Sequence, residues 1–193
     1  MDFLSFVTQA RTCRRFHEEK PLESADLDWL IDCARVTPSA RNAQQLRFIE
    51  VLGKTCKELF PLTHWAMALK DWGGPAEGER PTAFLGLLIP KNPAPTTYID
   101  CGICAQTIQL AAHSRGYGCC IIKSFEQNQA QSLLQVPSDL QLELLLGLGV
   151  ASEERKVVDV PESGSLNYFR DANNVHYVPK RAREELIIAR FVD

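Results

Sequence analysis

Apolar residues repeat at helical spacing in two parts of the N-terminal region. The segment FLSFV (3–7) follows Asp2 and predicts a short helix with one apolar face. A second helix is expected to begin at Ser24, because serine is a favourable N-cap residue. Its apolar positions recur every three or four residues, at Leu27, Leu30, Ile31 and Ala34. Pro38 and the small polar residues around it predict the end of this helix.

Four stretches read as strands. LRFIEVL (46–52) alternates between apolar and polar residues, whereas AFLGLLIP (83–90) and LELLLGLGV (142–150) are almost continuously apolar. Continuous apolar runs of this length are typical of strands buried on both faces. CCII (119–122) predicts a fourth, short strand.

The longest helix is expected to begin at Thr96 and to end at Gly116, a plausible left-handed cap. It is apolar nearly all round, so it should lie centrally. Residues 54–72 and 126–135 look helical, 152–180 look irregular, and 182–193 predict a helical turn followed by an apolar strand. Helices and strands mix without strict alternation. The sequence therefore predicts an α+β fold around one sheet, as a single domain over residues 1–193.

Composition narrows the class of protein. Of the 193 residues, 45% are apolar and 23% charged, and the formal net charge is -3. Such a balance is ordinary for a globular domain and argues against nucleic acid as the main partner. Apolar runs fall short of a membrane span. Seven cysteines without an evident secretory signal favour reduced thiols and a cytoplasmic location.

A basic cluster follows the first predicted helix. Arg11, Arg14 and Arg15 would share one helical face, and Thr12 adds a hydroxyl. Guanidinium groups with a hydroxyl suit a phosphate dianion, which offers several strong acceptors. The alternative is a solvated cluster at a helix C-terminus, where cations are favourable.

Polar residues gather between the second helix and the first strand. Ser39, Asn42 and Gln44 follow the helix end. Amide side chains donate and accept hydrogen bonds at once, which suits a heterocycle with a mixed hydrogen-bonding edge. Taken alone, however, the stretch favours a polar loop that makes its own turn hydrogen bonds.

Paired cysteines invite a zinc or dithiol hypothesis that the context disfavours. Cys101 and Cys104 lie inside an apolar helix, where cysteine behaves as a small hydrophobe. Cys119 and Cys120 are adjacent, and adjacent cysteines seldom bind one metal together. The four histidines show no ligand spacing and are interpreted as structural or exposed. Packing is the favoured interpretation for the cysteines, and no metal is expected.

In combination these stretches resemble the nitroreductase family of FMN-dependent oxidoreductases. The basic pattern at 11–16, the PSARNAQ stretch (38–44), the acid and glycine that open the long helix, and NYFRDANNVHYVPKRAREEL (167–186) follow one another in the family's order. Trp72 to Pro81 is similar to a motif of a short subgroup. Gln45 and Leu46 stand where that family usually has proline and tryptophan.

The resemblance implies a central, mostly antiparallel sheet flanked by helices in an intertwined homodimer. One FMN would lie at each subunit interface, and the segment from about 182 to 193 would wrap onto the partner. The basic cluster would grip the FMN phosphate, and residues around 38–42 would come from the other subunit. The implied cofactor-binding residues are Arg11, Thr12, Cys13, Arg14, Pro38, Ser39, Ala40, Asn42, Gln44, Ile122, Lys123, Ser124, Lys180 and Arg181.

The implied activity is ping-pong transfer of hydride from NADH or NADPH, through flavin N5, to an electron-poor acceptor such as a nitroaromatic or a quinone. The flavin carries the chemistry, so no catalytic side chain is expected. Thr63, His64 and Lys70 are candidates for the pyrimidine edge of the ring. The alternatives are a flavin-binding sensor or storage module with little turnover, or a thiol or zinc protein.

Overall fold

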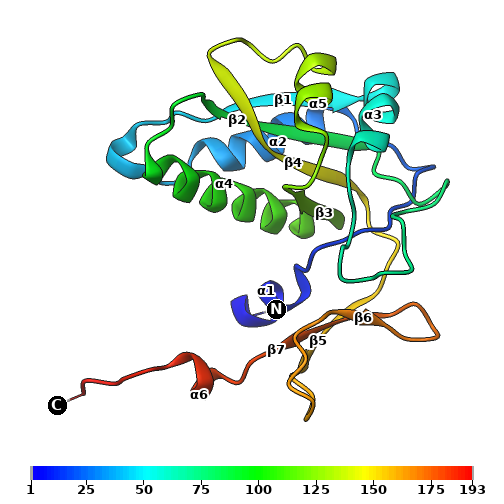
Figure 1. The fold of residues 1–193 in the computed structure, drawn as a ribbon, viewed down its shortest axis with the longest axis vertical. Helices are drawn as coiled ribbons and strands as arrows, with labels where there is room; N and C mark the ends of the chain where they lie inside the picture. Colours follow the sequence, from blue (N-terminus) through cyan, green and yellow to red (C-terminus); the bar gives the residue numbers. More distant parts are fainter. Residues whose placement is uncertain (1, 193) are drawn as a thin grey trace.

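The fold is built on a four-stranded antiparallel sheet. The computed structural model describes residues 2–192. The strands lie in the order β1-β2-β4-β3, and every neighbouring pair is antiparallel (Figure 1). This arrangement confirms the predicted α+β fold and its strands. Their bounds are β1 (Arg47–Leu52), β2 (Ala83–Pro90), β3 (Tyr117–Ile122) and β4 (Leu140–Val150).

Side chains of the two central strands alternate between two apolar clusters. Leu85 and its register partner Leu146 belong to one cluster, whereas Phe84 and Leu145 belong to the other. All four are fully buried. Because successive side chains of a strand point to opposite faces, a strand covered on both faces must be apolar throughout. This is why β2 and β4 read as continuous apolar runs.

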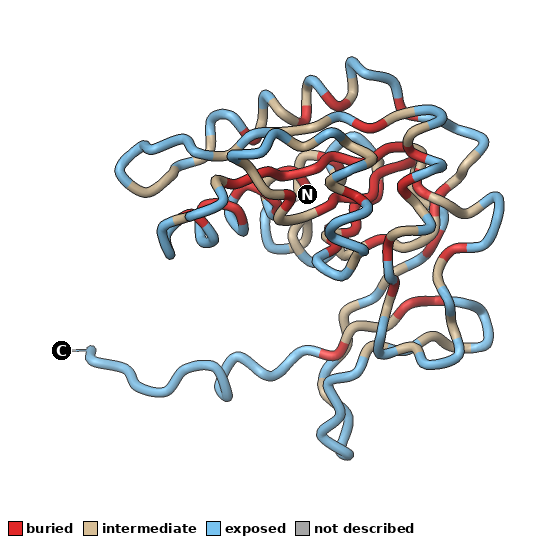
Figure 2. Tube along the Cα trace, turned by 45° about the horizontal axis from the view of Figure 1, so that its top comes forward, coloured by how far each residue is buried: buried red, intermediate tan, exposed pale blue. Residues whose placement is uncertain are grey.

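Helices cover both faces of this sheet. On one face, α2 (Ser24–Arg35) and α4 (Pro95–Ser114) contribute buried residues to the same cluster as Leu85. On the other face, the shorter α3 (Gly53–Leu59) and α5 (Gln127–Leu133) pack into the Phe84 cluster. Buried residues are concentrated in the sheet and along α4 (Figure 2). Within the described chain, no helix combines the length and apolar character needed to cross a membrane.

Helix ends lie close to their predicted positions. The N-cap of α2 is Glu23, one residue before the predicted Ser24, and the Asp26 carboxylate accepts the Glu23 N–H at 3.0 Å. Pro95 occupies the first turn of α4, where its missing N–H costs nothing, so the helix begins before Thr96. Gly116 follows α4 with φ of 77°, which confirms the left-handed cap.

The predicted helix over 54–72 is wrong beyond its first turns. α3 ends at Leu59, and a 3-10 turn (Phe60–Leu62) containing Pro61 follows. Thr63 then forms a β-bridge with Phe125 and so continues extended. Proline cannot supply the N–H that a longer α-helix would need, and the bridge draws the chain toward the end of β3.

The stretch 152–180, expected to be irregular, contains a second small sheet. Its strands are β5 (Arg155–Asp159), β6 (Phe169–Arg170) and β7 (His176–Lys180), in the order β5-β7-β6. β5 and β7 are parallel, and β6 and β7 are antiparallel. This sheet lies beside the main body, with α1 (Phe3–Gln9) next to it (Figure 1).

The C-terminal segment leaves the body of the molecule. After the short α6 (Arg183–Leu186), residues 187–192 form neither helix nor strand, so the predicted apolar strand is absent from this single chain. Ile188 and Phe191 are more than nine-tenths exposed. The segment runs away from the folded core as an exposed arm (Figure 2).

The N-terminal segment 10–17 is held directly on the edge of the main sheet. The Cys13 N–H donates to the Cys119 carbonyl at 2.9 Å, and the His17 N–H donates to the Val150 carbonyl at 2.8 Å. Two glycines provide the room for this contact. A Cβ atom at Gly118 would lie 2.5 Å from Cys13 Sγ, and one at Gly149 would lie 3.0 Å from the ring of Phe16.

Replacing Gly118 with alanine should therefore separate the segment from the sheet. We expect Gly118→Ala to lower the free energy of unfolding by roughly 1–3 kcal/mol, the usual cost of an overpacked core. Denaturant unfolding measures it. Gly73→Ala is the control, since its Cβ would meet no atom within 4 Å. Equal stability of the two variants would contradict this packing.

Candidate functional site

The basic cluster does not lie on a helix. α1 ends at Gln9, and residues 10–15 continue without helical structure along β3 and β4, so the predicted shared face of Arg11, Arg14 and Arg15 is wrong. Arg15 turns away and pairs with Glu79 at 3.2 Å. Arg11 and Arg14 instead face one cavity.

This cavity, called the basic cavity below, has a volume of about 420 Å³ and lies between the main body and the small sheet. The N-terminal segment, α4, β3 and the small sheet all contribute to its walls. Arg11, Thr12, Arg14 and Lys180 were all among the cofactor-binding residues that the family resemblance implied, and the fold brings them together here. The principal lining residues are Arg11, Thr12, Arg14, Gln109, His176 and Lys180.

Arg14 is held from three sides. Its Nη1 lies 3.2 Å from Nε2 of His176, and its guanidinium lies 4.6 Å from the centre of the Tyr168 ring. Its backbone N–H donates to the Glu153 carboxylate at 2.5 Å. Glu153 is buried and also pairs with Arg170 at 3.0 Å. The Arg14 guanidinium is therefore fixed in place without a carboxylate of its own among the described residues.

Positive charge gathers around this cavity. Burial lowers the pKa of Arg11, and the nearby Arg155 lowers it further. Burial also lowers the pKa of His176 to about 4, and Arg14 and Arg170 contribute next. Within the described chain, neither Arg11 nor Arg155 forms an ion pair with a carboxylate. Such an assembly of cations favours an anionic ligand.

Two residues that line the cavity each have a buried nitrogen atom without a partner. Nε of Arg11 and Nδ1 of His176 make no hydrogen bond with any described residue. A buried polar group without a partner costs free energy comparable to a lost hydrogen bond. An anion with several acceptor oxygens would satisfy such donors, so the residues present fit a phosphate group. This is the observation on which the functional assignment rests.

The polar loop predicted to contact a heterocycle lines a different cavity. Pro38, Ser39 and Gln44 surround a space of about 300 Å³, here called the loop cavity. The Ala40 N–H donates to the buried Asp100 carboxylate of α4 at 2.9 Å. Asn42 lies in the same loop but does not line the cavity. On one chain, the fold therefore does not bring this loop to the basic cavity.

Three residues in this loop region have left-handed backbones. Arg41, Asn42 and Gln44 have φ of 55°, 53° and 48°. Non-glycine residues adopt this conformation at a cost of order 1 kcal/mol each, and such residues cluster at ligand-binding sites. The hydrogen bond from Ala40 to Asp100 helps to hold the loop in this shape.

The other predicted cofactor residues lie apart from the basic cavity. Ile122 is buried in the core, Lys123 pairs with Glu143 at 2.6 Å, and the Ser124 carbonyl accepts the His64 N–H. Cys13 belongs to the N-terminal segment, and its side chain is wholly buried against the main sheet at Gly118. Arg181 pairs with Glu185 at 3.1 Å on the surface. Their roles toward a cofactor stay predictions.

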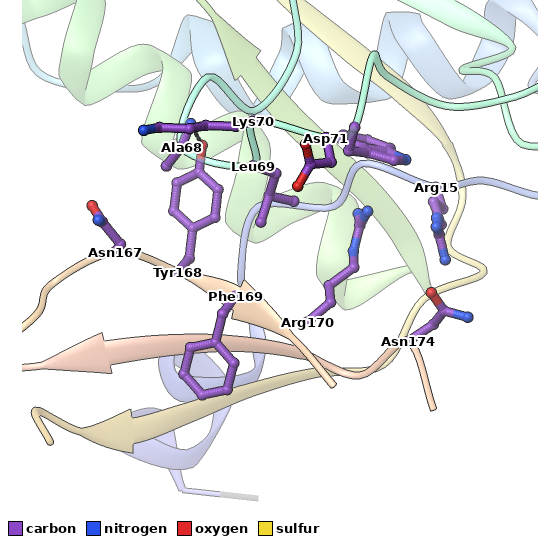
Figure 3. Close-up of a pocket in the computed structure, with 11 residues that line it drawn as sticks. Arg15, Ala68, Leu69, Lys70, Asp71, Asn167, Tyr168, Phe169, Arg170 and Asn174 are labelled. Atoms are coloured by element: carbon purple, nitrogen blue, oxygen red, sulfur yellow. Dashed lines mark hydrogen bonds between the residues drawn. The ribbon is translucent and has the colours of Figure 1, made fainter. Parts of the chain in front are cut away.

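The candidates for the pyrimidine edge are also dispersed. Thr63 is buried and accepts the indole N–H of Trp65 at 2.8 Å. His64 pairs with Glu126 at 2.8 Å. Lys70 lines a third cavity of about 550 Å³, whose walls include Arg15, Trp72 and Arg170. In Figure 3, Tyr168 and Arg170 rise from the small sheet into this third cavity, and Tyr168 also lines the basic cavity.

Six of the seven cysteines are buried thiols, and Cys33 is half-buried. All seven are free, and burial raises the pKa of Cys101 to about 11 and that of Cys104 to about 12. Neutral buried thiols are poor nucleophiles and poor metal ligands. Among residues 2–192, no three side chains of His, Cys, Asp or Glu are placed to hold a metal ion. Both residues of the Cys101 and Cys104 pair belong to the core packed on α4.

Sequence reasoning missed the contribution of the small sheet. Tyr168 and His176 line the basic cavity, and Glu153 anchors the segment that carries Arg14. His176 had been interpreted with the other histidines as structural or exposed. A possible signal was the run VHYV (175–178) after two asparagines, because valine and tyrosine favour strands and asparagine favours turns.

Comparisons with known proteins agree on one family. The model of the Nitroreductase family matches residues 7–150. A nitroreductase family protein from Clostridium novyi NT shares the fold with a TM-score of 0.66 and 22% identity, over 79% of this chain and 86% of that one. An FMN-dependent nitroreductase from Clostridium difficile R20291 has a TM-score of 0.65 and 23% identity, over 80% and 90%. No protein of curated function matches the sequence.

The low pKa of His176 predicts a pH dependence of stability. The folded pKa of about 4 lies below the ordinary value of 6.5, so the unfolded chain binds the proton first. The stability that the neutral imidazole contributes is complete above pH 6.5 and is lost as pH falls toward 4. The free energy of unfolding should fall by roughly 3 kcal/mol at most from this cause. The unfolding free energy of wild type minus that of His176→Gln, measured from pH 7 to 4, isolates it. A flat difference would contradict the burial of a neutral imidazole.

Proposed function

Because the chain belongs to the nitroreductase family, we propose that it is an FMN-dependent oxidoreductase that passes electrons from NADH or NADPH to an electron-poor acceptor. The observation that carries the proposal is the basic cavity, where Arg11 and Arg14 converge with unpartnered buried donors. The solved relative described as FMN-dependent supports the choice of cofactor.

Arg11, Thr12, Arg14 and Lys180 would hold the phosphate of FMN. Their charges and the Thr12 hydroxyl match a dianion with several acceptor oxygens. Bound FMN would supply the redox chemistry, exchange of hydride with the nicotinamide and then with the acceptor. The protein would contribute position and charge. A nucleophile or general base is not needed for this role, and the buried neutral cysteines offer none.

We propose further that two copies of the chain complete each site. On one chain the phosphate-binding residues and the loop at 38–44 line separate cavities. α4 leaves Ile99 and Ile103 exposed at helical spacing, and the arm after residue 186 is apolar and exposed. Exposed apolar surface of this kind is typical of an interface. A second copy that covers α4 would bring its own 38–44 loop to the basic cavity, and the arm at 182–193 would wrap onto it.

Removal of residues 187–193 should weaken this dimer. We expect the truncated chain to sediment as a monomer at concentrations where the full chain is a dimer, because the arm's apolar contacts are lost. Analytical ultracentrifugation of both proteins measures this. An unchanged dimer, or a monomeric full chain, would contradict the role given to the arm.

Replacing either arginine should weaken FMN binding. We expect Arg11→Ala and Arg14→Ala each to weaken the free energy of FMN binding by about 1.5–3 kcal/mol, the range for a hydrogen bond to a charged group. Fluorescence titration of the flavin-free protein with FMN gives the affinity. Lys54→Ala is the control, since Lys54 is exposed and pairs with Glu58 on α3, away from both cavities. A double variant that purifies with a full complement of FMN would contradict the assignment of Arg11 and Arg14 to the phosphate.

Turnover distinguishes an enzyme from a flavin-storage module. Anaerobic mixing of the FMN-loaded protein with NADH or NADPH should bleach the flavin absorbance rapidly, and an acceptor such as a quinone should restore it. Stopped-flow measurement of the flavin absorbance follows both steps. Tight FMN binding without bleaching by either nucleotide would favour the module instead.

A further inference from the structure

His176 lies at the contact between the small sheet and the N-terminal segment. It is the first residue of β7, is fully buried, and lines the basic cavity. Its backbone N–H donates to the Glu154 carbonyl at 2.9 Å, which fixes its place in the chain. The Tyr168 ring centre lies 5.2 Å from its own, and Arg14 Nη1 lies 3.2 Å from its Nε2. The imidazole therefore touches the arginine that is assigned to the phosphate.

The chemistry of this contact fixes the tautomer. A guanidinium group can only donate hydrogen bonds, so Nε2 of His176 must accept. The proton of the neutral ring is then on Nδ1. That Nδ1–H is buried and has no acceptor among the described residues.

Burial and the surrounding arginines favour the neutral form of the ring. Arg14 and Arg15 face it from the N-terminal segment, and Arg155 and Arg170 face it from the small sheet. Glu153 is the buried carboxylate nearby, but its oxygens are already engaged by the Arg14 N–H and by Arg170. A protonated ring could not accept from Arg14 and would add a further cation to this group.

We propose that His176 is a positioning residue: its Nε2 orients the Arg14 guanidinium, and its Nδ1–H provides a further donor for the phosphate of the cofactor. The proposal rests on the function proposed above and deepens it. A purely structural residue in this place would be expected to be apolar or fully hydrogen-bonded, because a buried N–H without a partner destabilises the fold. The unmet Nδ1–H and the unmet Nε of Arg11 instead belong to two residues that line the same cavity.

The experiment compares FMN with riboflavin, which lacks the phosphate. His176→Phe keeps most of the ring volume but removes both nitrogens. We expect it to weaken FMN binding about 10- to 100-fold while riboflavin binding changes less than about twofold, as for one charged hydrogen bond. His176→Gln should recover most of the affinity, since its amide can accept from Arg14 and donate elsewhere. His17→Phe, at a partly exposed histidine paired with Glu19, is the matched control.

The outcomes separate this inference from the proposed function. Equal loss of FMN and riboflavin in His176→Phe would make the residue merely structural, and an unchanged FMN affinity would remove its role altogether. In an Arg14→Met background, His176→Phe should lower the FMN affinity by a smaller factor than in wild type. This is expected because His176 acts partly by orienting Arg14. Wild-type protein that binds FMN no better than riboflavin would overturn the phosphate assignment itself, and this inference with it.

If His176→Phe does not fold, a measurement on the wild-type protein tests the proposal instead. Long-range ¹H–¹⁵N NMR spectra of the FMN-loaded protein report the tautomer of each histidine. The signal that disappears in His176→Gln should show a neutral ring protonated at Nδ1 at pH 7. A ring protonated at Nε2, or a charged imidazolium, would overturn the proposal because neither can accept from Arg14.

Discussion

The close contact between residues 10–17 and the edge of the main sheet is the constraint on which the site depends. Gly118 and Gly149 leave no side chain on that surface, and Cys13 and Phe16 fill the space. Backbone hydrogen bonds to Cys119 and Val150 set the register. An extended segment fixed in this way presents Arg11 and Arg14 to one cavity and sends Arg15 elsewhere.

The basic cavity brings together more arginine side chains than nearby carboxylates neutralise. Glu153 anchors the Arg14 backbone and neutralises Arg170, whereas Arg11 and Arg155 have no carboxylate partner in the described chain. Cations brought together under partial burial destabilise a folded protein unless an anion joins them. The proposed FMN would join these cations through its phosphate, and a ligand that binds only the folded state stabilises it.

Two cavities share one helix. α4 lines the loop cavity with Asp100 and Cys104, and it lines the basic cavity with Gln106 and Gln109. The exposed Ile99 and Ile103 lie on the same helix. A partner subunit that covered α4 would therefore lie next to both cavities. The proposed dimer accounts for this geometry, since neither cavity alone offers both a phosphate grip and a polar loop for a ring.

Local patterns in the sequence were enough to predict the central strands and the presence of an anion-binding cluster. Continuous apolar runs identified β2 and β4 because both faces of those strands are covered, and the clustered Arg11 and Arg14 pointed to an anion. The tertiary structure decided the rest. Arg15 leaves the cluster because the segment is extended, and His176 enters the site because β7 pairs with strands at distant positions. Helical and strand periodicity are local properties of a chain, whereas strand pairing and the burial of a charged cluster depend on contacts between residues far apart in sequence.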